Sequence, residues 1–330
     1  MEKIRIAQIG TSRNSHGSII FETLTKHPDL FEVVGYAFPE GEREKFPDQM
    51  GFFCGYPELT VDEILSDESI TAVAVETEEI YLTKYALLCA QHGKHIHMEK
   101  PGGLSLPLFE ELVETVKRNG TVFHVGYMYR YNPTLIDIFN RVRAGEIGRV
   151  ISVEAHMSGW RDERATKWLE TFPGGMMFFL GCHLIDLVLR LQGEPRAIYP
   201  FNKATGVYDT AAKDFSMAVL EYERGVSFVK TTQTERGGFL RRQLVITGER
   251  GKFEVRPLEI NIGYPLQKTE YLLNTGTDWN DAGEKFASAP YDRYNAMIRA
   301  FGEMVTGQRE NPYTYDYELT LFKTLLACCK

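Results

Sequence analysis

Lys100 ends a short segment whose residue types suit catalysis on an oxygen-bearing substrate. The segment Met98-Glu99-Lys100-Pro101 follows a run from Lys94 to His97 that reads as a buried strand. Open α/β sheets bind their ligands at the carboxyl ends of strands, and an ammonium held there stabilises a developing alkoxide. Pro101 restricts the backbone of Lys100 and so helps to aim it. We therefore expect a functional lysine at this strand end, although a Glu-Lys-Pro sequence by itself is equally typical of a solvated turn.

His183 is the second residue whose type suits proton transfer. It lies within an apolar stretch, Met176 to Leu191, that reads as a helix. A neutral imidazole accepts protons near pH 7, as the oxidation of a hydroxyl requires, but a histidine in an apolar helix is also typical of a satisfied core residue. Asp186, one turn later, is placed to orient the imidazole or to cap a neighbouring loop. Phe179, one turn earlier, is expected to face the same way and to give the substrate an apolar wall.

A damaged dinucleotide-binding turn follows the first predicted strand. The expected pattern is Gly-x-Gly-x-x-Gly, but serines hold its second and third glycine positions, and Gly17 takes part only if the turn is longer than usual. The helix that follows still offers free N–H groups to an anion. A plain strand-to-helix loop explains the sequence about as well. The residues of this turn that we expect to contact a cofactor are Gly10, Thr11, Ser12 and Arg13.

The end of the second predicted strand leaves the choice between NAD and NADP open. An acid is expected there if a ribose hydroxyl is bound, but Phe38 occupies the position. Its ring is suited to lie against an adenine, and equally suited to be an edge residue of the core.

The first 125 residues alternate between strand-like and helix-like segments. This alternation predicts βαβ units, a parallel sheet and right-handed crossovers, and hence a doubly wound Rossmann domain over residues 1–125. The predicted strands are Ile4–Ile9, Phe31–Ala37, Thr71–Val75, the run around Ile96, and Thr121–Val125. The predicted helices are Gly17–Lys26, Val61–Ser66, Tyr81–Gln91 and Leu106–Arg118.

Residues 126–330 have a different pattern, which predicts an α+β domain with a large, mainly antiparallel open sheet. Asn132-Pro133 is typical of a helix start, and Gly174-Gly175 opens the long apolar helix that contains His183. Many short strands joined by tight turns follow before two closing helices. Such a sheet needs its open face covered, so we expect a homodimer or homotetramer formed through it.

Composition excludes several classes of protein. The chain has 330 residues, a hydrophobic fraction of 43% and a net charge of −8. This charge argues against nucleic acid as a partner, no apolar run is long enough to span a membrane, and the first residues lack a signal-peptide core. The five cysteines form no metal-type pair, which favours reduced thiols in the cytoplasm and no bound metal.

The order of these motifs resembles the Gfo/Idh/MocA family (glucose–fructose oxidoreductase, inositol dehydrogenase and relatives) over nearly the whole chain. The resemblance implies a Rossmann domain, a C-terminal α/β domain, and NAD or NADP as cofactor. The segments that carry it are Gly93-Lys94-His95, Glu99-Lys100-Pro101, Gly126 to Pro133, Gly145 to Gly148, Gly174-Gly175 and Gly181 to Asp186.

By position, Lys100 resembles the family's lysine that contacts cofactor and substrate, and His183 resembles its catalytic histidine. Thr77 and Glu78 fall in a loop that touches the cofactor in family members. The further expected contacts are Glu99 for the cofactor and Tyr129, Trp160 and Arg161 for the substrate. The chain also departs from the family, because Phe179 stands where many members have an aspartate and Leu82 where a histidine is common.

Three functions remain open on the sequence alone. The first is an NAD(P)-dependent oxidoreductase acting on a sugar, cyclitol or related polyol. The second is a lyase or glycosidase that retains the dinucleotide and uses transient oxidation, which the missing aspartate at Phe179 motivates. The third is a redox-silent protein that binds a dinucleotide or a metabolite, which the altered glycine turn and Phe38 motivate.

Overall fold

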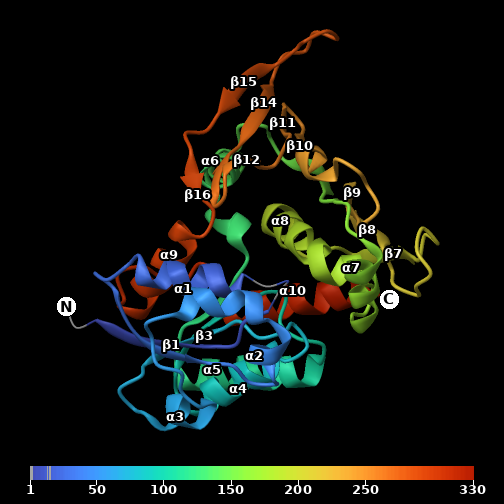
Figure 1. Ribbon diagram of the computed structural model, residues 1–330. Helices are drawn as coiled ribbons and strands as arrows, with labels where there is room; N and C mark the ends of the chain where they lie inside the picture. The colour runs from blue at the N-terminus through green and yellow to red at the C-terminus, as the bar shows by residue number, and fades with distance from the viewer. Residues whose placement is uncertain (1–2, 13, 15) are drawn as a thin grey trace. The chain divides into compact units, whose positions relative to one another are not determined.

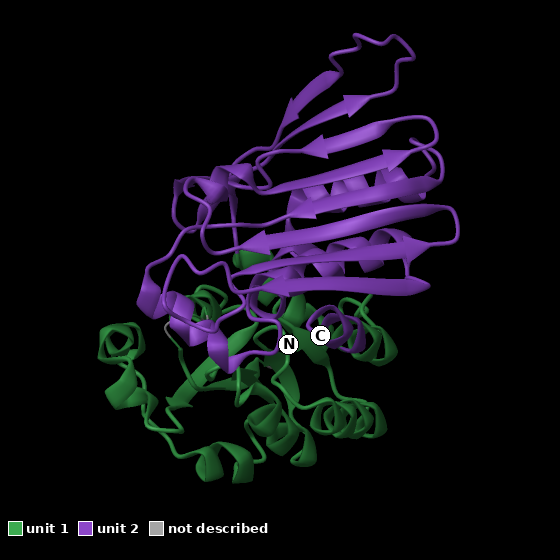
Figure 2. Ribbon diagram, turned by 90° about the vertical axis from the view of Figure 1, so that its right-hand side faces the viewer, with its two compact units in different colours: residues 1–127, 294–322 green, residues 128–293, 323–330 purple. Residues whose placement is uncertain are grey.

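The computed structural model describes residues 3–12, 14 and 16–330 (Figure 1). Two compact units can be separated by their internal contacts. Unit 1 comprises residues 1–127 and 294–322, and unit 2 comprises residues 128–293 and 323–330 (Figure 2). Among the described residues, no helix combines the length and the apolar character needed to cross a lipid bilayer.

Unit 1 is built on a five-stranded parallel sheet in the order β2-β1-β3-β4-β5. Its central strand β3 has the sequence AVAV and is completely buried, as expected for a parallel sheet covered on both faces. The strands are β1 (Ile4–Ile9), β2 (Phe31–Ala37), β3 (Ala72–Val75), β4 (His95–Met98) and β5 (Phe123–Val125). The helices are α1 (Gly17–Thr25), α2 (Glu42–Lys45), η1 (Pro47–Phe53), α3 (Val61–Ser66), α4 (Leu82–Gln91), α5 (Leu106–Asn119) and α9 (Asn295–Val305).

Helix α9 belongs to unit 1 although it lies far along the chain. Its Phe301 stacks on Phe31 with ring centroids 6.3 Å apart. A Cβ atom on Gly302 would come within 2.8 Å of the same Phe31 ring, so a glycine is needed for this close approach. Helix α10 (Tyr315–Cys328) follows, and its Phe322 stacks on Phe109 of α5.

Unit 2 is built on an eight-stranded sheet in the order β15-β14-β11-β10-β6-β9-β8-β7. Strands β6 and β9 pair in parallel and the other neighbours pair antiparallel, so the predicted mainly antiparallel sheet is confirmed. Figure 2 shows this sheet face on, with helices of the same unit behind it. The strands are β6 (Val150–His156), β7 (Ala197–Lys203), β8 (Phe215–Tyr222), β9 (Gly225–Thr232), β10 (Gln243–Gly248), β11 (Lys252–Val255), β14 (Glu270–Asn274) and β15 (Glu284–Ala287).

The remaining elements of unit 2 carry most of its candidate site residues. They are η2 (Met128–Tyr131), α6 (Pro133–Arg143), α7 (Glu163–Trp168), η3 (Leu169–Thr171), η4 (Met177–Gly181), α8 (Cys182–Gln192), η5 (Gly238–Arg241) and a small sheet of β12 (Ile260–Gly263), β13 (Leu266–Lys268) and β16 (Tyr291–Asp292). Asn132 caps α6 by accepting hydrogen bonds from the N–H groups of Thr134 and Leu135, as its position before Pro133 predicts.

The long helix predicted before Gln192 has two parts. The first, η4, is a turn of π-helix, and α8 continues from it. A π-turn inserts one residue per turn relative to an α-helix and is frequent at functional sites. His183 is the second residue of α8 and therefore directly follows this change of helical type.

Candidate functional site

The turn after β1 and the loop after β3 meet where the strand order of unit 1 reverses. Gly10 has a φ of +89°, and a Cβ atom there would lie 2.5 Å from the Thr77 side chain and 2.6 Å from its backbone. Gly17 is the first residue of α1. A Cβ atom there would lie 3.1 Å from Glu76 and Thr11, so the absence of a side chain lets the helix pack closely against both residues. The turn is therefore longer than the standard motif. Its outer glycines keep two of the expected roles, which are a tight turn and close packing of helix on strand.

Two polar side chains that sequence reasoning missed hold this turn. The Nε2 atom of Gln8 donates to the carbonyls of Gly10 and Gly17, at 3.0 Å each, and so ties the two ends of the turn together. The carboxylate of Glu42 accepts the N–H of Thr11 at 2.9 Å and the N–H of Glu78 at 3.1 Å. Burial raises the pKa of Glu42 to about 8, against the lowering effect of these two hydrogen bonds. Neither residue belongs to a pattern of its own in the sequence.

Phe38 lies in an aromatic cluster at the end of β2. Its ring centroid is 4.7 Å from that of Tyr36 and 4.8 Å from that of Phe53, and the Arg43 guanidinium lies over it at 5.6 Å. Phe38 is partly buried, so both of its predicted roles, at a core edge and beside an adenine, fit this placement. Ser12 lies buried in the turn after β1, whereas Arg13 falls outside the described residues.

Lys100 lies two residues beyond the end of β4, at the carboxyl edge of the sheet, and is only 1% exposed. Its ammonium lies 3.8 Å from Glu99 Oε1, and Oε2 of the same carboxylate lies 3.6 Å from His16 Nδ1. Burial raises the pKa of Glu99, but the hydrogen bond and charge of His16 and the charge of Lys100 outweigh it, so this pKa is lowered overall. Glu99 is thus held as an anion between two cationic or donor groups.

Two more acids are buried near Lys100. Burial raises the pKa of Glu76 well above its usual range, and the negative charge of Glu99 adds to this effect. Burial also raises the pKa of Glu79 to about 7, although the charge of Lys100 acts in the opposite direction. The raised pKa of Glu76 favours its protonated form, and Glu79 is about half ionised at pH 7.

A pair of buried histidines lies beneath this group. The Nδ1 atoms of His97 and His124 are 2.7 Å apart, and His97 Nε2 is 3.4 Å from Glu76 Oε1. Burial lowers the pKa of His97 to about 4, so the ring is neutral at pH 7. Phe301 of α9 lies against both imidazoles, with centroids 5.8 and 5.7 Å away. In the described part of the chain, no group of three or more histidine, cysteine or acidic side chains is arranged to hold a metal ion.

In unit 2, His183 packs edge-on against Tyr129, with ring centroids 5.3 Å apart and planes at 89°. His183 is 2% exposed. The Tyr129 hydroxyl donates to Glu259 Oε1 at 2.6 Å, and the same oxygen accepts hydrogen bonds from Arg242 at 3.0 Å and Arg293 at 2.7 Å. Burial raises the pKa of Tyr129, which keeps its hydroxyl protonated. Glu259 is a further residue that sequence reasoning missed, because its partners are distant in the chain.

Asp186 is paired with Arg130. The guanidinium donates from Nε and Nη2 to one carboxylate oxygen, and both side chains are buried. The sequence left Asp186 between orienting the imidazole of His183 and capping a loop. The observed ion pair instead joins α8 to η2, the segment that carries Tyr129.

A cavity of about 380 Å³ in unit 2 includes two of the predicted substrate residues, Trp160 and Arg161, in its lining. Met176 and Leu180, which precede His183 on the same helical segment, form another wall. Phe179 lies 3% exposed in a cluster with Trp168 and Phe172, and the Arg161 guanidinium is 5.5 Å from the centre of its ring.

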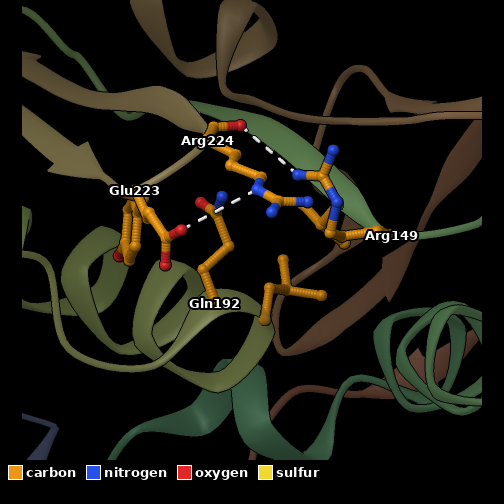
Figure 3. Close-up of a pocket in the computed structure, with 7 residues that line it drawn as sticks. Arg149, Gln192, Glu223 and Arg224 are labelled. Atoms are coloured by element: carbon orange, nitrogen blue, oxygen red, sulfur yellow. Dashed lines mark hydrogen bonds and ion pairs between the residues drawn. The ribbon is translucent and has the colours of Figure 1, made fainter.

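A second cavity of about 460 Å³ lies elsewhere on unit 2 and contains none of the predicted residues. Arg149, Gln192, Glu223 and Arg224 form its rim (Figure 3). Both arginines interact with neighbouring residues of the cavity. Arg149 donates a hydrogen bond to the carbonyl of Arg224, and Arg224 Nε lies 3.8 Å from Glu223 Oε1.

The turn after β1 fits the phosphates of a dinucleotide. Gly10 leaves no side chain between the turn and Thr77, and α1 presents its N-terminus without a side-chain cap from His16. Lys100 supplies a cation at the carboxyl edge of the same sheet.

Comparisons with known proteins agree with this geometry. Residues 4–127 match the model of the oxidoreductase family with an NAD-binding Rossmann fold, and residues 137–254 match that of the GFO/IDH/MocA C-terminal domain. A Bacillus subtilis protein named scyllo-inositol 2-dehydrogenase (NAD(+)) is 32% identical over 271 residues, covering 78% of this chain and 74% of its own. The chain therefore belongs to the Gfo/Idh/MocA family, which confirms the predicted fold, oxidoreductase class and nicotinamide cofactor.

Two further proteins are similar to this chain, one in fold and one over part of its sequence. The solved structure of UDP-N-acetylglucosamine 3-dehydrogenase from Acidithiobacillus ferrooxidans has a TM-score of 0.77 at 18% identity, with 99% of this chain and 97% of that chain covered. A 2,7-anhydro-N-acetylneuraminate hydratase from Mediterraneibacter gnavus is 27% identical over 139 residues, covering 41% of this chain and 37% of its own.

Proposed function

We propose that the protein transfers hydride between a nicotinamide and a CH–OH group of a sugar, cyclitol or related polyol. The observation that carries the proposal is a buried lysine, Lys100, at the carboxyl end of a strand in an NAD-binding fold. The similarity to an enzyme named for a cyclitol substrate supports the choice of substrate class. Cofactor contacts are proposed for Gly10, Thr11, Ser12, Arg13, Phe38, Thr77, Glu78, Glu99 and Lys100, and substrate contacts for Lys100, Tyr129, Trp160, Arg161, Phe179 and His183.

Lys100 and His183 have complementary roles in this proposal. The bound nicotinamide supplies the hydride acceptor. The imidazole of His183 accepts the hydroxyl proton as the carbinol carbon loses its hydride. The ammonium of Lys100 stabilises the alkoxide character that develops on the oxygen, and Glu99 fixes the ammonium by its charge. In the reverse direction, His183 returns the proton to the oxygen.

A panel of polyols incubated with NAD or NADP tests this function. We expect at least one polyol to reduce the nicotinamide, and a deuterium label on the oxidised carbon to appear on the reduced cofactor. Lys100→Met should lower kcat strongly while dinucleotide binding persists. Lys94→Met is the matched control, because Lys94 precedes the same strand at its other end and its ammonium donates to the carbonyl of Asp67. Bound dinucleotide without any hydride transfer across the panel would contradict the proposal.

A lyase, hydratase or glycosidase that retains its dinucleotide is the second candidate. The relative named as a hydratase supports it. Transient oxidation followed by return of the hydride gives product without net reduction of the nicotinamide. Product formation at constant nicotinamide absorbance therefore distinguishes this candidate from the first.

We also propose a cytoplasmic homo-oligomer. All five cysteines are free thiols, as a reducing compartment requires. Large apolar side chains such as Tyr199 and Phe201 of β7 and Val226 of β9 are exposed on the eight-stranded sheet, and a second copy of the chain would cover them. Sedimentation of the purified protein measures the oligomer size.

A further inference from the structure

The cavity of about 380 Å³ in unit 2 has the size of a small-ligand site. Trp160 contributes an aromatic wall that is 47% exposed, and a Cβ atom on Gly237, which also lines the cavity, would meet nothing within 4 Å. Met176 and Leu180 connect this cavity to the helical segment of His183. The volume and the aromatic wall suit one sugar ring.

Two arginines, Arg161 and Arg242, line this cavity. Arg242 lies over the ring of Phe239 at 4.5 Å and donates from Nη1 to Glu259. Its Nε atom is buried and makes no hydrogen bond to the described residues. A buried N–H group of a cation without an acceptor is costly, so a ligand oxygen at this atom would be stabilising.

The charges around Arg242 add to this demand for an anion. One carboxylate oxygen, Glu259 Oε1, accepts hydrogen bonds from both Arg242 and Arg293. Arg241, the preceding residue in the chain, forms an ion pair with Glu235, and Glu235 Oε2 also lies 3.2 Å from His156 Nε2. Glu259 is thus shared between two guanidinium groups, and Glu235 between Arg241 and His156. A guanidinium binds carboxylate and phosphate oxygens through paired N–H groups.

We propose that Arg161 and Arg242 bind an anionic group of the substrate, so that the preferred substrate is a polyol that carries a carboxylate or a phosphate. This inference rests on the proposed function, because it assigns the substrate class of the same site. Trp160 packs on the sugar ring, and the arginines fix the ring by its charged substituent.

Calorimetric titration of the full chain saturated with reduced dinucleotide tests the inference, because the reduced cofactor cannot accept a hydride from the added sugar. The probes are D-glucose, D-glucuronate and D-glucose 6-phosphate, which share a ring and differ in charge. We expect glucuronate or glucose 6-phosphate to bind at least about tenfold more tightly than glucose. The tighter of the two identifies the carboxylate or the phosphate as the recognised group.

Arg161→Met and Arg242→Met should each remove most of the difference in affinity between the anionic probes and glucose. Arg241→Met is the control, because Arg241 is adjacent in sequence, half exposed and paired with Glu235. It should keep the preference for the anionic probe.

Equal affinities for the three probes, or no binding of any of them, would overturn the inference. A preference for the anionic probes in a protein that never transfers hydride would instead uphold the anion site and refute the proposed redox function. The two failures are therefore distinguishable.

Discussion

Arg130 and Asp186 form a buried ion pair in which Nε and Nη2 lie 3.0 and 2.8 Å from the same carboxylate oxygen. The pair joins η2, which carries Tyr129, to α8, which carries His183. Because Tyr129 and His183 also meet edge to face, the ion pair fixes the two elements whose aromatic rings are in contact. The ion pair therefore positions His183 indirectly, because it holds α8 against η2.

Removing one partner of this pair is expected to be strongly destabilising. Asp186→Asn should lower the free energy of unfolding by about 3–5 kcal/mol, because the Arg130 cation loses a buried counter-charge. The double variant Arg130→Met with Asp186→Leu should recover a large part of this loss. Urea unfolding followed by circular dichroism measures both, and a loss below about 1 kcal/mol for Asp186→Asn would contradict the assigned role.

Gly10→Ala should lower the free energy of unfolding by more than the strain of a positive φ angle alone would cause. Gly55 has nearly the same φ, +90°, but open space around it, so Gly55→Ala should cost only about 1 kcal/mol. Gly10→Ala should cost at least about 3 kcal/mol, because the new methyl group would overlap Thr77. It should also weaken dinucleotide binding, as measured by calorimetry. Equal losses in the two variants would show that the contact with Thr77 is relieved cheaply.

Glu79 should make the stability of the protein depend on pH. Its pKa is about 7 when folded, against a usual value of 4.5. The folded state thus holds the proton more tightly, and this contribution to stability is fully present below pH 4.5 and is lost as the pH rises to about 7. When the pH is raised from 5 to 8, the free energy of unfolding of Glu79→Gln should therefore fall by about 2–3 kcal/mol less than that of the wild type. His97, whose pKa is lowered, acts in the opposite direction and is common to both proteins.

The exposed Glu44 of α2 provides the control for this measurement. Urea midpoints of Glu44→Gln should follow the wild-type pH dependence. A Glu79→Gln variant that also follows it would show that Glu79 titrates normally in the folded protein.

Phe179→Asp should be costly although many family members have an aspartate at this position. The ring packs against Trp168 and Phe172, and a carboxylate there would be buried with Arg161 as a nearby cation. We expect a loss of about 3–5 kcal/mol in stability and a changed substrate preference in whatever protein remains folded. Phe179→Leu, which stays apolar, should lose less than half as much. An aspartate variant of wild-type stability would mean that the aromatic cluster reorganises freely.

Local sequence signals predicted much of the fold. The strands Ile4–Ile9 and Phe31–Ala37 and the helix Val61–Ser66 lie where their residue patterns place them. Asn132 and Pro133 begin their helix as expected, because capping depends on neighbouring residues only. The π-turn η4 was not predicted, since an apolar run has the same composition in either helical type.

Long-range partners could not be predicted in the same way. Glu42 bonds residues that lie 31 and 36 positions away, and Glu259 bonds Tyr129 across 130 positions. Neither acid belongs to a sequence motif, and the tertiary fold buries both of them. The return of α9 to unit 1 is of the same kind, because its amphipathic pattern shows that it packs but not on which element.

The account depends most on Lys100 and His183 acting on the same chemical step. A double-mutant cycle tests this directly, with kcat of the wild type, Lys100→Met, His183→Asn and the double variant measured on a confirmed polyol. We predict that each single variant loses at least about a hundredfold in kcat, with dinucleotide affinity retained, and that the second substitution adds little to the first. Full activity in either single variant, or losses that multiply independently in the double variant, would contradict the account.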